Sequence, residues 1–93
     1  MGVSFRLPTP LSPYTDGRTR VELPGSPATV GAALGALFAL YPGLRLRVLD
    51  ERQRLRPHVN LFVGTESVRF ARGLDTPLVD GAEIVILPAI SGG

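Results

Sequence analysis

The sequence contains no cysteine, no lysine and no tryptophan among its 93 residues, and its one histidine is His58. Without cysteine, the chain has no disulfide, no thiolate nucleophile and no cysteine-based metal site. One histidine is too few for a zinc cluster built on histidines, and a lone histidine is more often structural or exposed than a ligand. The composition therefore predicts that the chain holds no metal ion.

Long hydrophobic runs are also missing. The longest apolar stretch without a charge is residues 24–44, but three prolines and four glycines interrupt it. A membrane-spanning helix needs about 20 predominantly apolar residues in one piece. Residues 1–13 also lack the charged start and the apolar run of a signal peptide. We therefore expect a soluble, cytoplasmic protein without a membrane segment.

The length and the composition indicate one small folded domain. Hydrophobic residues make up 44% of the chain and charged residues 19%, which is typical of a folded domain rather than a disordered segment. A core of this size leaves little room for a deep active site. The sequence also offers no nucleophile with an evident base and no glycine-rich phosphate loop. An enzyme acting alone is therefore not the favoured interpretation.

All ten basic residues are arginine, and the formal net charge is only +2. Five of these arginines lie in the segment Arg45–Arg56, where Leu44, Val48 and Leu49 are expected to form a short helical turn. Asp50 and Glu51 lie among the arginines, and no aromatic residue is present there to stack on bases. The pattern favours a solvated surface over a nucleic-acid site. An acidic protein partner remains an open alternative.

Periodic patterns predict the strands. Apolar alternation or apolar runs favour strands at residues 3–7, 19–23, 59–63 and 83–87, and a short edge strand at residues 68–70. The first two strands are expected to pair as a hairpin with a long, proline-rich connection. The last strand is an almost continuous apolar run, which suits the centre of a sheet.

One main helix is predicted between the second and third strands. It begins at Ser26 or at Thr29, because hydroxyl side chains cap exposed amides, and it ends before Pro42. We expect Gly31 and Gly35 to allow close packing of this helix on the sheet. The order of elements predicts an α+β domain in which the sheet wraps over the helix. The apolar stripe of the helix comprises Val30, Ala33, Leu34, Leu37, Phe38 and Tyr41.

The chain ends with Gly92 and Gly93 after a short segment that follows the last strand. One interpretation is simple fraying, because chain ends are commonly small, polar and disordered. The other is that Gly93 presents a reactive carboxylate on a narrow stalk, because glycine lacks a Cβ atom and leaves its carbonyl carbon open to attack. The two glycines alone do not distinguish these interpretations.

The order of elements and the terminal Gly-Gly together resemble the ubiquitin-like β-grasp sulfur carriers, which include the small subunit of molybdopterin synthase and the thiamin sulfur carrier. Within that family, the chain looks most like the branch that serves thiocarboxylate-dependent cysteine synthesis, on the residues Pro8-Thr9-Pro10-Leu11 followed by Thr15-Asp16-Gly17 and Val68-Arg69-Phe70 followed by Gly73-Leu74. The segments that carry the family resemblance are Ala28-Thr29-Val30, Tyr41-Pro42-Gly43-Leu44, His58-Val59-Asn60-Leu61-Phe62-Val63, Leu78-Val79-Asp80-Gly81-Ala82-Glu83 and Ile86-Leu87-Pro88-Ala89-Ile90-Ser91-Gly92-Gly93.

The resemblance implies a fold and a cycle of chemistry. The fold is a ubiquitin-like β-grasp with a mixed sheet of four to five strands on one main helix, formed by residues 1–88, with a flexible tail at residues 89–93. An activating enzyme related to ubiquitin activators would adenylate Gly93 with ATP, and a sulfur source would then convert it to a thiocarboxylate. The chain would be a protein co-substrate rather than an enzyme, with no cofactor bound to itself.

The resemblance also implies partners. For cysteine synthesis they are a pyridoxal-phosphate-dependent synthase and a metalloprotease that releases the product; for the alternative in molybdenum cofactor synthesis, the partner is the large subunit of molybdopterin synthase. A further alternative is a ubiquitin-like modifier joined to target lysines through Gly93.

Family members dock their partners through an apolar patch on the exposed face of the sheet. Phe62 and Leu87 are the candidates for this patch here, and Ile90 and Ser91 in the tail are expected to contact partners too. Phe62 and Leu87 are equally well explained as core residues, because alternation cannot assign a face until the strand register is known.

Overall fold

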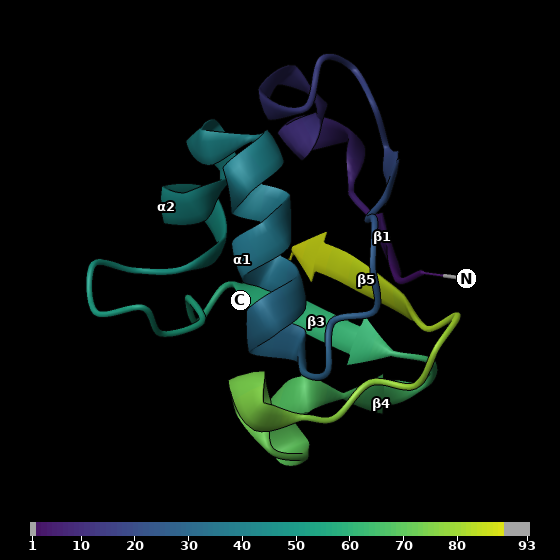
Figure 1. Ribbon diagram of the computed structural model, residues 1–93. Coiled ribbons are helices and arrows are strands. Elements are labelled where there is room, and N and C mark those ends of the chain that lie inside the picture. Colours follow the sequence, from purple (N-terminus) through teal and green to yellow (C-terminus); the bar gives the residue numbers. More distant parts are fainter. Residues whose placement is uncertain (1, 89–93) are drawn as a thin grey trace.

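The computed structural model describes residues 2–88 and has an α+β architecture, with one layer of helix packed on one mixed sheet (Figure 1). The strands occur in the spatial order β2-β1-β5-β3-β4. The central pair β1 and β5 is parallel, and the other three neighbouring pairs are antiparallel. The strands are β1 (Ser4–Arg6), β2 (Arg20–Glu22), β3 (Val59–Val63), β4 (Glu66–Ser67) and β5 (Glu83–Pro88). The predicted hairpin of the first two strands and the central place of the last strand are both confirmed.

The main helix α1 (Val30–Leu40) begins at the second of the two predicted sites. Thr29 has extended backbone angles, and its side-chain oxygen accepts a hydrogen bond from the backbone N–H of Ala32 at 3.1 Å. This bond satisfies one of the amides that have no partner within the first turn of a helix. The helix ends at Leu40 with Tyr41 as its C-cap residue, because Pro42 follows and cannot donate a backbone hydrogen bond.

Short helical segments make up most of the remaining structure. The predicted helical turn after the main helix is present as α2 (Arg45–Val48). Within residues 2–88 the 3₁₀ segments are η1 (Thr9–Tyr14), η2 (Pro42–Leu44), η3 (Val68–Phe70) and η4 (Gly73–Asp75). The segment η1 lies within the predicted long, proline-rich connection of the hairpin. It is secured by the buried Thr15, whose hydroxyl donates to the carbonyl of Arg18 at 2.6 Å.

The core lies between α1 and one face of the sheet. Phe5, Val21, Leu61, Ile84 and Ile86 point from four strands toward the helix and are at most 5% exposed. Burying a side chain of this size contributes about 1.5–3 kcal/mol. The predicted stripe of the helix meets them: Val30, Ala33, Leu34 and Leu37 are buried, and Phe38 and Tyr41 pack at its margin.

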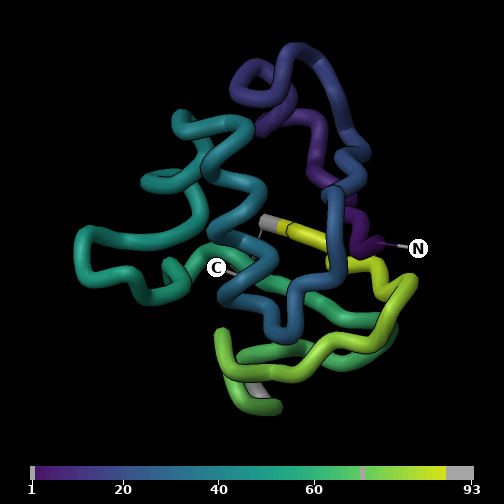
Figure 2. The backbone as a smooth tube through the Cα atoms, in the orientation of Figure 1, coloured from purple at the N-terminus to yellow at the C-terminus, as the bar shows by residue number. Residues whose placement is uncertain are grey.

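The segment that follows η4 secures the start of α1. The backbone N–H of Val30 donates to the carbonyl of Thr76 at 3.0 Å, and the N–H of Leu78 donates to the carbonyl of Ala28 at 2.9 Å. Figure 2 shows this segment passing the first turn of the helix before the chain enters β5. The helix is therefore attached at its N-terminus to the connection that leads into the central strand.

The prediction of an edge strand at residues 68–70 is wrong. The edge strand is β4, two residues earlier, where Val63 pairs with Glu66 across a two-residue connection. Gly64 has a φ of 63°, which glycine adopts readily, and this tight turn places the edge strand earlier than the apolar pattern predicts. The chain then turns inward as η3, where Val68 is fully buried.

The expectation that Gly31 and Gly35 pack on the sheet is also wrong. A Cβ atom on Gly31 would lie 3.1 Å from the backbone oxygen of Leu74, so this glycine allows η4 to approach the helix. A Cβ atom on Gly35 would meet nothing within 4 Å. Gly35 therefore faces open space.

Candidate functional site

The residues of the predicted chemistry, Gly92 and Gly93, lie outside the described residues, as do Ile90, Ser91 and the whole predicted tail at residues 89–93. The structure does place the strand that precedes them. Strand β5 lies in the middle of the sheet, and the backbone of its last residue, Pro88, is paired with Val59 of β3. The C-terminal residues therefore follow directly from the central strand.

The face of the sheet away from α1 carries an apolar strip across β3 and β5. Because side chains alternate along a strand and Leu61, Ile84 and Ile86 point toward the helix, their neighbours point the other way. Phe62 is paired with Val85 in the register of these two strands. We use the name apolar strip for Phe62, Val85 and Leu87.

The register thus resolves the two interpretations of Phe62 and Leu87. Both lie on the open face of the sheet; Phe62 is half-buried and Leu87 is 42% exposed. Sequence reasoning missed Val85, which lies between them on the same face. Val85 lies between Ile84 and Ile86 in the sequence, and both of these are buried. In a strand that is covered on one face only, the residue between two buried ones must point to the open face, but the sequence alone does not show that β5 is such a strand.

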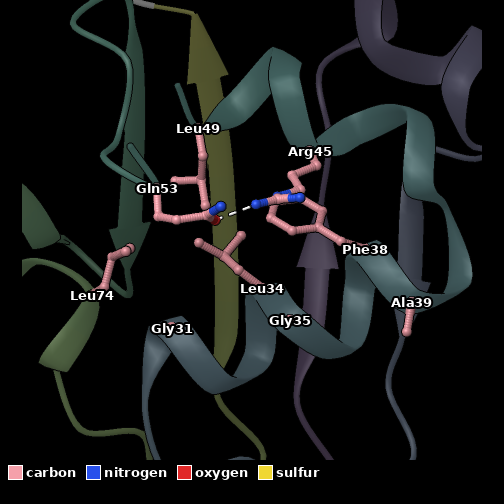
Figure 3. Close-up of a pocket in the computed structure, with 9 residues that line it drawn as sticks. All are labelled: Gly31, Leu34, Gly35, Phe38, Ala39, Arg45, Leu49, Gln53 and Leu74. Carbon is pink, nitrogen blue, oxygen red and sulfur yellow. Dashed lines mark hydrogen bonds between the residues drawn. The ribbon is translucent and has the colours of Figure 1, made fainter. Parts of the chain in front are cut away.

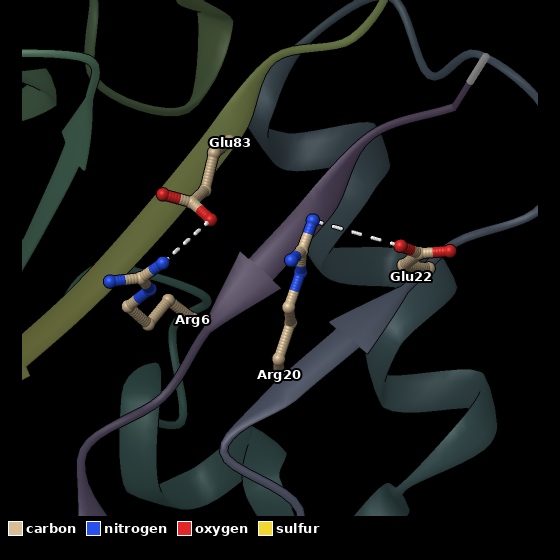
Figure 4. A network of polar contacts seen from close by, with 4 residues as sticks. All are labelled: Arg6, Arg20, Glu22 and Glu83. Carbon is tan, nitrogen blue, oxygen red and sulfur yellow. Dashed lines mark ion pairs between the residues drawn. The ribbon is translucent and has the colours of Figure 1, made fainter.

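The other half of the open face is charged. Arg6 of β1 pairs with Glu83 of β5 at 3.5 Å, and Arg20 of β2 pairs with Glu22 of the same strand at 3.7 Å (Figure 4). We call these four residues the charged strip. Their side chains are 35–77% exposed, so each pair contributes only about 0–1 kcal/mol to stability. The open face therefore presents an apolar strip next to a strip of paired charges.

Hydrogen bonds organise the arginine-rich segment. Asp50 accepts the backbone N–H groups of Arg54 at 3.0 Å and of Arg52 at 2.8 Å, and the bond from Arg54 is the main reason why the pKa of this carboxyl lies below its usual range. Arg56 donates to the carbonyl of Leu46 at 2.6 Å, which ties the end of this loop to α2. The segment is largely solvated, as predicted.

Within residues 2–88, the structure offers no buried reactive group. The two buried polar side chains there, Thr15 and Thr76, both hydrogen-bond to backbone carbonyls of their own turns. His58 is exposed, and no three His, Asp or Glu side chains in this part of the chain are grouped as metal ligands. No helix of the described residues is long and apolar enough to cross a bilayer.

Comparison with known proteins agrees with this arrangement. The ThiS family model matches residues 6–93. The chain is 40% identical over 95 aligned residues to the sulfur carrier protein CysO of Mycobacterium tuberculosis H37Rv, with 100% of each protein covered. A chain in the crystal structure of the Amycolatopsis orientalis BexX/CysO complex superposes with a TM-score of 0.86 at 35% identity, covering 98% of this chain and 99% of that one. The crystal structure of SAMP1 from Haloferax volcanii matches with a TM-score of 0.80 at 29% identity, covering 98% of both chains.

These similarities extend over the elements that carry the open face as well as over the C-terminal residues. The predicted mixed sheet on one main helix is confirmed, and it is the ubiquitin-like β-grasp. Because the family model spans nearly the whole chain and the fold agrees with solved sulfur carriers, the chain belongs to the ThiS family of ubiquitin-like β-grasp proteins.

Proposed function

We propose that this protein is a sulfur carrier that holds sulfur as a thiocarboxylate on Gly93 and donates it in cysteine biosynthesis. The observation that supports the proposal most is the 40% identity to sulfur carrier protein CysO over the full length of both proteins, which includes the final Gly-Gly of this chain. The chain acts in this cycle as a protein co-substrate, and the bond-making steps take place on partner enzymes.

The chemistry follows from the weakness of a free carboxylate as an acyl donor. An activating enzyme related to ubiquitin activators transfers AMP from ATP to the Gly93 carboxylate and releases pyrophosphate. Sulfide then attacks the carbonyl carbon, and AMP leaves with the bonding electron pair. The product is a glycyl thiocarboxylate, in which one carboxylate oxygen has been replaced by sulfur.

The acceptor in this proposal is an activated serine bound to a pyridoxal-phosphate-dependent synthase. The thiocarboxylate sulfur displaces the leaving group on the serine side chain, and a metalloprotease later releases the new cysteine from the carrier. ATP and pyridoxal phosphate therefore belong to the partners, and the carrier itself contributes Gly93 and its docking surface. Gly92, which has no Cβ atom, lets the terminus enter a narrow active-site channel.

The apolar strip is the docking surface of this proposal. Aromatic and aliphatic anchors on an exposed face are the residues that contribute most to protein interfaces. Phe62 and Leu87 supply such anchors on the strands β3 and β5, and the terminus that must reach the partner follows β5. A partner seated on the strip would therefore receive Gly93 close to the same surface, with Ile90 and Ser91 as further contacts.

The experiment is a mass measurement of the intact chain and of its C-terminal peptide after incubation with an activating enzyme, ATP and sulfide. We expect one oxygen to be exchanged for sulfur in the peptide that ends in Gly93. Localisation matters, because oxidation of Met1 changes the mass by nearly the same amount. A chain that lacks Gly92 and Gly93 is the control and should stay unchanged. No exchange with several activating enzymes that modify another carrier in parallel would contradict the proposal.

A second candidate function is protein modification, favoured by the similarity to SAMP1, the small archaeal modifier protein 1 of Haloferax volcanii. In this function the activated Gly93 is joined to lysine amines of other proteins. The chain has no lysine, so it cannot form lysine-linked chains with itself. Covalent adducts that carry Gly93 on the lysines of cellular proteins would support this role. A labelled thiocarboxylate that passes only to small-molecule products would support the carrier role alone.

A further inference from the structure

Helix α1 carries no charged or hydrogen-bonding side chain in its 11 residues. A surface helix normally has polar residues on the side opposite its apolar stripe, and a helix that is apolar all round is normally buried. Here the outer side is exposed at Ala32, Gly35, Ala39 and Leu40, and Leu40 is 51% exposed. Within residues 2–88, nothing covers this side of the helix.

A groove of about 410 Å³ lies beside this exposed side, between α1, α2 with the loop that follows it, and η4 (Figure 3). Leu34 and Phe38 of α1 line it together with Leu49, and Leu74 of η4 lies across from them. The side chains around it are therefore apolar on three sides. The groove is on the helix layer, so it is separated by the sheet from the apolar strip on the open face.

Gly35 has no side chain to fill the groove, but as a glycine in a helix interior it lowers the stability of α1. Glycine in a helix interior is less favourable than alanine by about 1 kcal/mol. Packing within the described chain does not explain this glycine, because a Cβ atom on it would meet nothing within 4 Å. Gly35, Gly31 and Ala39 all line the groove, where a larger side chain would fill it. The residue choice is explained if another molecule occupies this space.

The charges around the groove are asymmetric. Arg45 lies on its rim and donates through Nε to Gln53 at 3.3 Å (Figure 3). Arg52 and Arg54 follow in the same loop with exposed side chains, and within residues 2–88 none of these three arginines forms a salt bridge. Asp50 of this loop accepts backbone N–H groups, Glu51 is exposed, and Asp75 follows Leu74 in η4, whose N-cap residue is the exposed Arg72. The α2 side is therefore net positive, whereas the charges of Asp75 and Arg72 balance on the η4 side.

We propose that this groove docks an acidic segment of a partner protein, which places an aliphatic side chain over the half-buried Phe38 and Leu74 and directs a carboxylate toward Arg45 on the rim. The apolar lining fits an aliphatic side chain, and the Arg45 guanidinium, which forms no salt bridge within residues 2–88, fits a carboxylate, with which arginine forms strong charged hydrogen bonds. Nucleic acid fits less well, because the groove is lined by a single aromatic side chain, Phe38, whereas proteins that bind single strands stack successive bases on several. The site is independent of the chemistry at Gly93, and both faces can be engaged at once.

The test uses the full chain labelled with ¹⁵N and a capped peptide in which two leucines are flanked by aspartates and glutamates. We expect the amide signals of α1 and of the loop after α2 to shift, and those of the apolar strip to stay in place. Replacing the acidic residues of the peptide by their amides should weaken binding by about tenfold, since hydrogen bonds to charged groups are the stronger ones. Binding should also weaken as salt is added.

Two pairs of variants make the assignment specific. Gly35→Leu fills the groove and favours the helix, so it should abolish peptide shifts in a chain that unfolds no more easily than the parent. Ala32→Leu adds the same side chain to the same helix outside the groove and should bind normally. Arg45→Gln should weaken binding by about tenfold, whereas Arg18→Gln, in an exposed turn elsewhere, should not change it.

Several results would overturn the proposal. They are the absence of any shift at millimolar peptide, shifts confined to the open face of the sheet, and equal binding of the amide peptide. Displacement of the peptide by a thymidine oligonucleotide that binds more tightly in the groove would assign it to nucleic acid. Concentration-dependent shifts of the same amides in the chain alone, with a dimer in sedimentation, would assign it to a second copy.

Discussion

The two faces of β3 and β5 share one backbone and one set of hydrogen bonds, yet their side chains lie in opposite environments. Leu61, Ile84 and Ile86 point toward α1 and are at most 1% exposed. Phe62 and Leu87, each next in sequence to one of these, lie on the open face, where Leu87 is 42% exposed. Both sets are large and apolar, so hydrophobicity does not separate them. The face alone distinguishes a residue that stabilises the fold from one that is available to a partner.

The largest expected effect is on the inner face. Ile86→Ala removes a side chain that is 1% exposed in the central strand, and it should lower the free energy of unfolding by about 2–5 kcal/mol. Lost burial and the cavity left behind both contribute. Urea unfolding followed by circular dichroism measures this change. Leu87→Ala, one residue further along the same strand, should change the free energy by less than about 1 kcal/mol.

These paired variants test the assignment of faces directly. Ile86→Val is the graded control, and it should cost about 0.5–1.5 kcal/mol because one methylene is removed. If Leu87→Ala destabilised the protein as much as Ile86→Ala, the open face would be covered in solution, and the contrast between the two faces would be wrong.

On the open face, we expect substitutions to change the rate at which partner enzymes load sulfur on Gly93 more than they change the stability of the fold. Leu87→Asp places a charge in the apolar strip and should slow sulfur loading of Gly93 by at least about tenfold. The reason is that losing an anchor residue weakens binding at an interface by about 2 kcal/mol, and every 1.4 kcal/mol is a factor of about ten. The loading assay by mass spectrometry measures the rate. The matched control is Glu22→Gln in the charged strip, which should load normally. A normal rate for Leu87→Asp would place the docking surface elsewhere on the molecule.

A smaller effect is expected at the helix that covers the inner face. Thr29→Ala removes the side-chain oxygen that accepts from the N–H of Ala32, and it should lower the free energy of unfolding by about 1 kcal/mol. Thermal unfolding measures it. Thr29→Ser keeps the cap and should restore most of the stability. Because Thr29 is far from the open face in the fold, neither variant should change the rate of sulfur loading.

The sequence predicts the elements with strong local signals. The helix from Thr29 to Pro42 has a capping hydroxyl, a regular apolar stripe and a proline stop, and the apolar run from Glu83 to Leu87 indicates a central strand. The edge strand was displaced by two residues, because the turn at Gly64 and the burial of Val68 depend on tertiary packing. A short apolar run alone does not reveal whether it is an edge strand or an inward turn.

The candidate site shows the same limit. The terminal Gly-Gly is visible in the sequence, but the choice between core and surface for Phe62 requires the register of β3 against β5. A shift of one residue would exchange Phe62 with Leu61 and move every side chain of β3 to the other face. The groove beside α1 was not predictable either, since Leu74 and Gln53 reach it from elements distant in sequence. In the sequence, only the spacing of Gly31 and Gly35 points to this side of the helix, and that spacing by itself predicts packing on the sheet.

The smallest expected effect concerns the boundary between the two strips of the open face. Arg6 and Glu83 are 3.5 Å apart with half-exposed side chains, so a double-mutant cycle with Arg6→Gln and Glu83→Gln should give a coupling of only about 0.2–1 kcal/mol. Added salt should reduce the coupling, because solvent and ions screen exposed pairs. Coupling that survives molar salt would mean that the pair is shielded from water, and that the charged half of the open face is organised for stability like the inner face. Weak, screened coupling would mean that these charges stay in contact with solvent, in contrast to the buried side chains on the other face of the same strands.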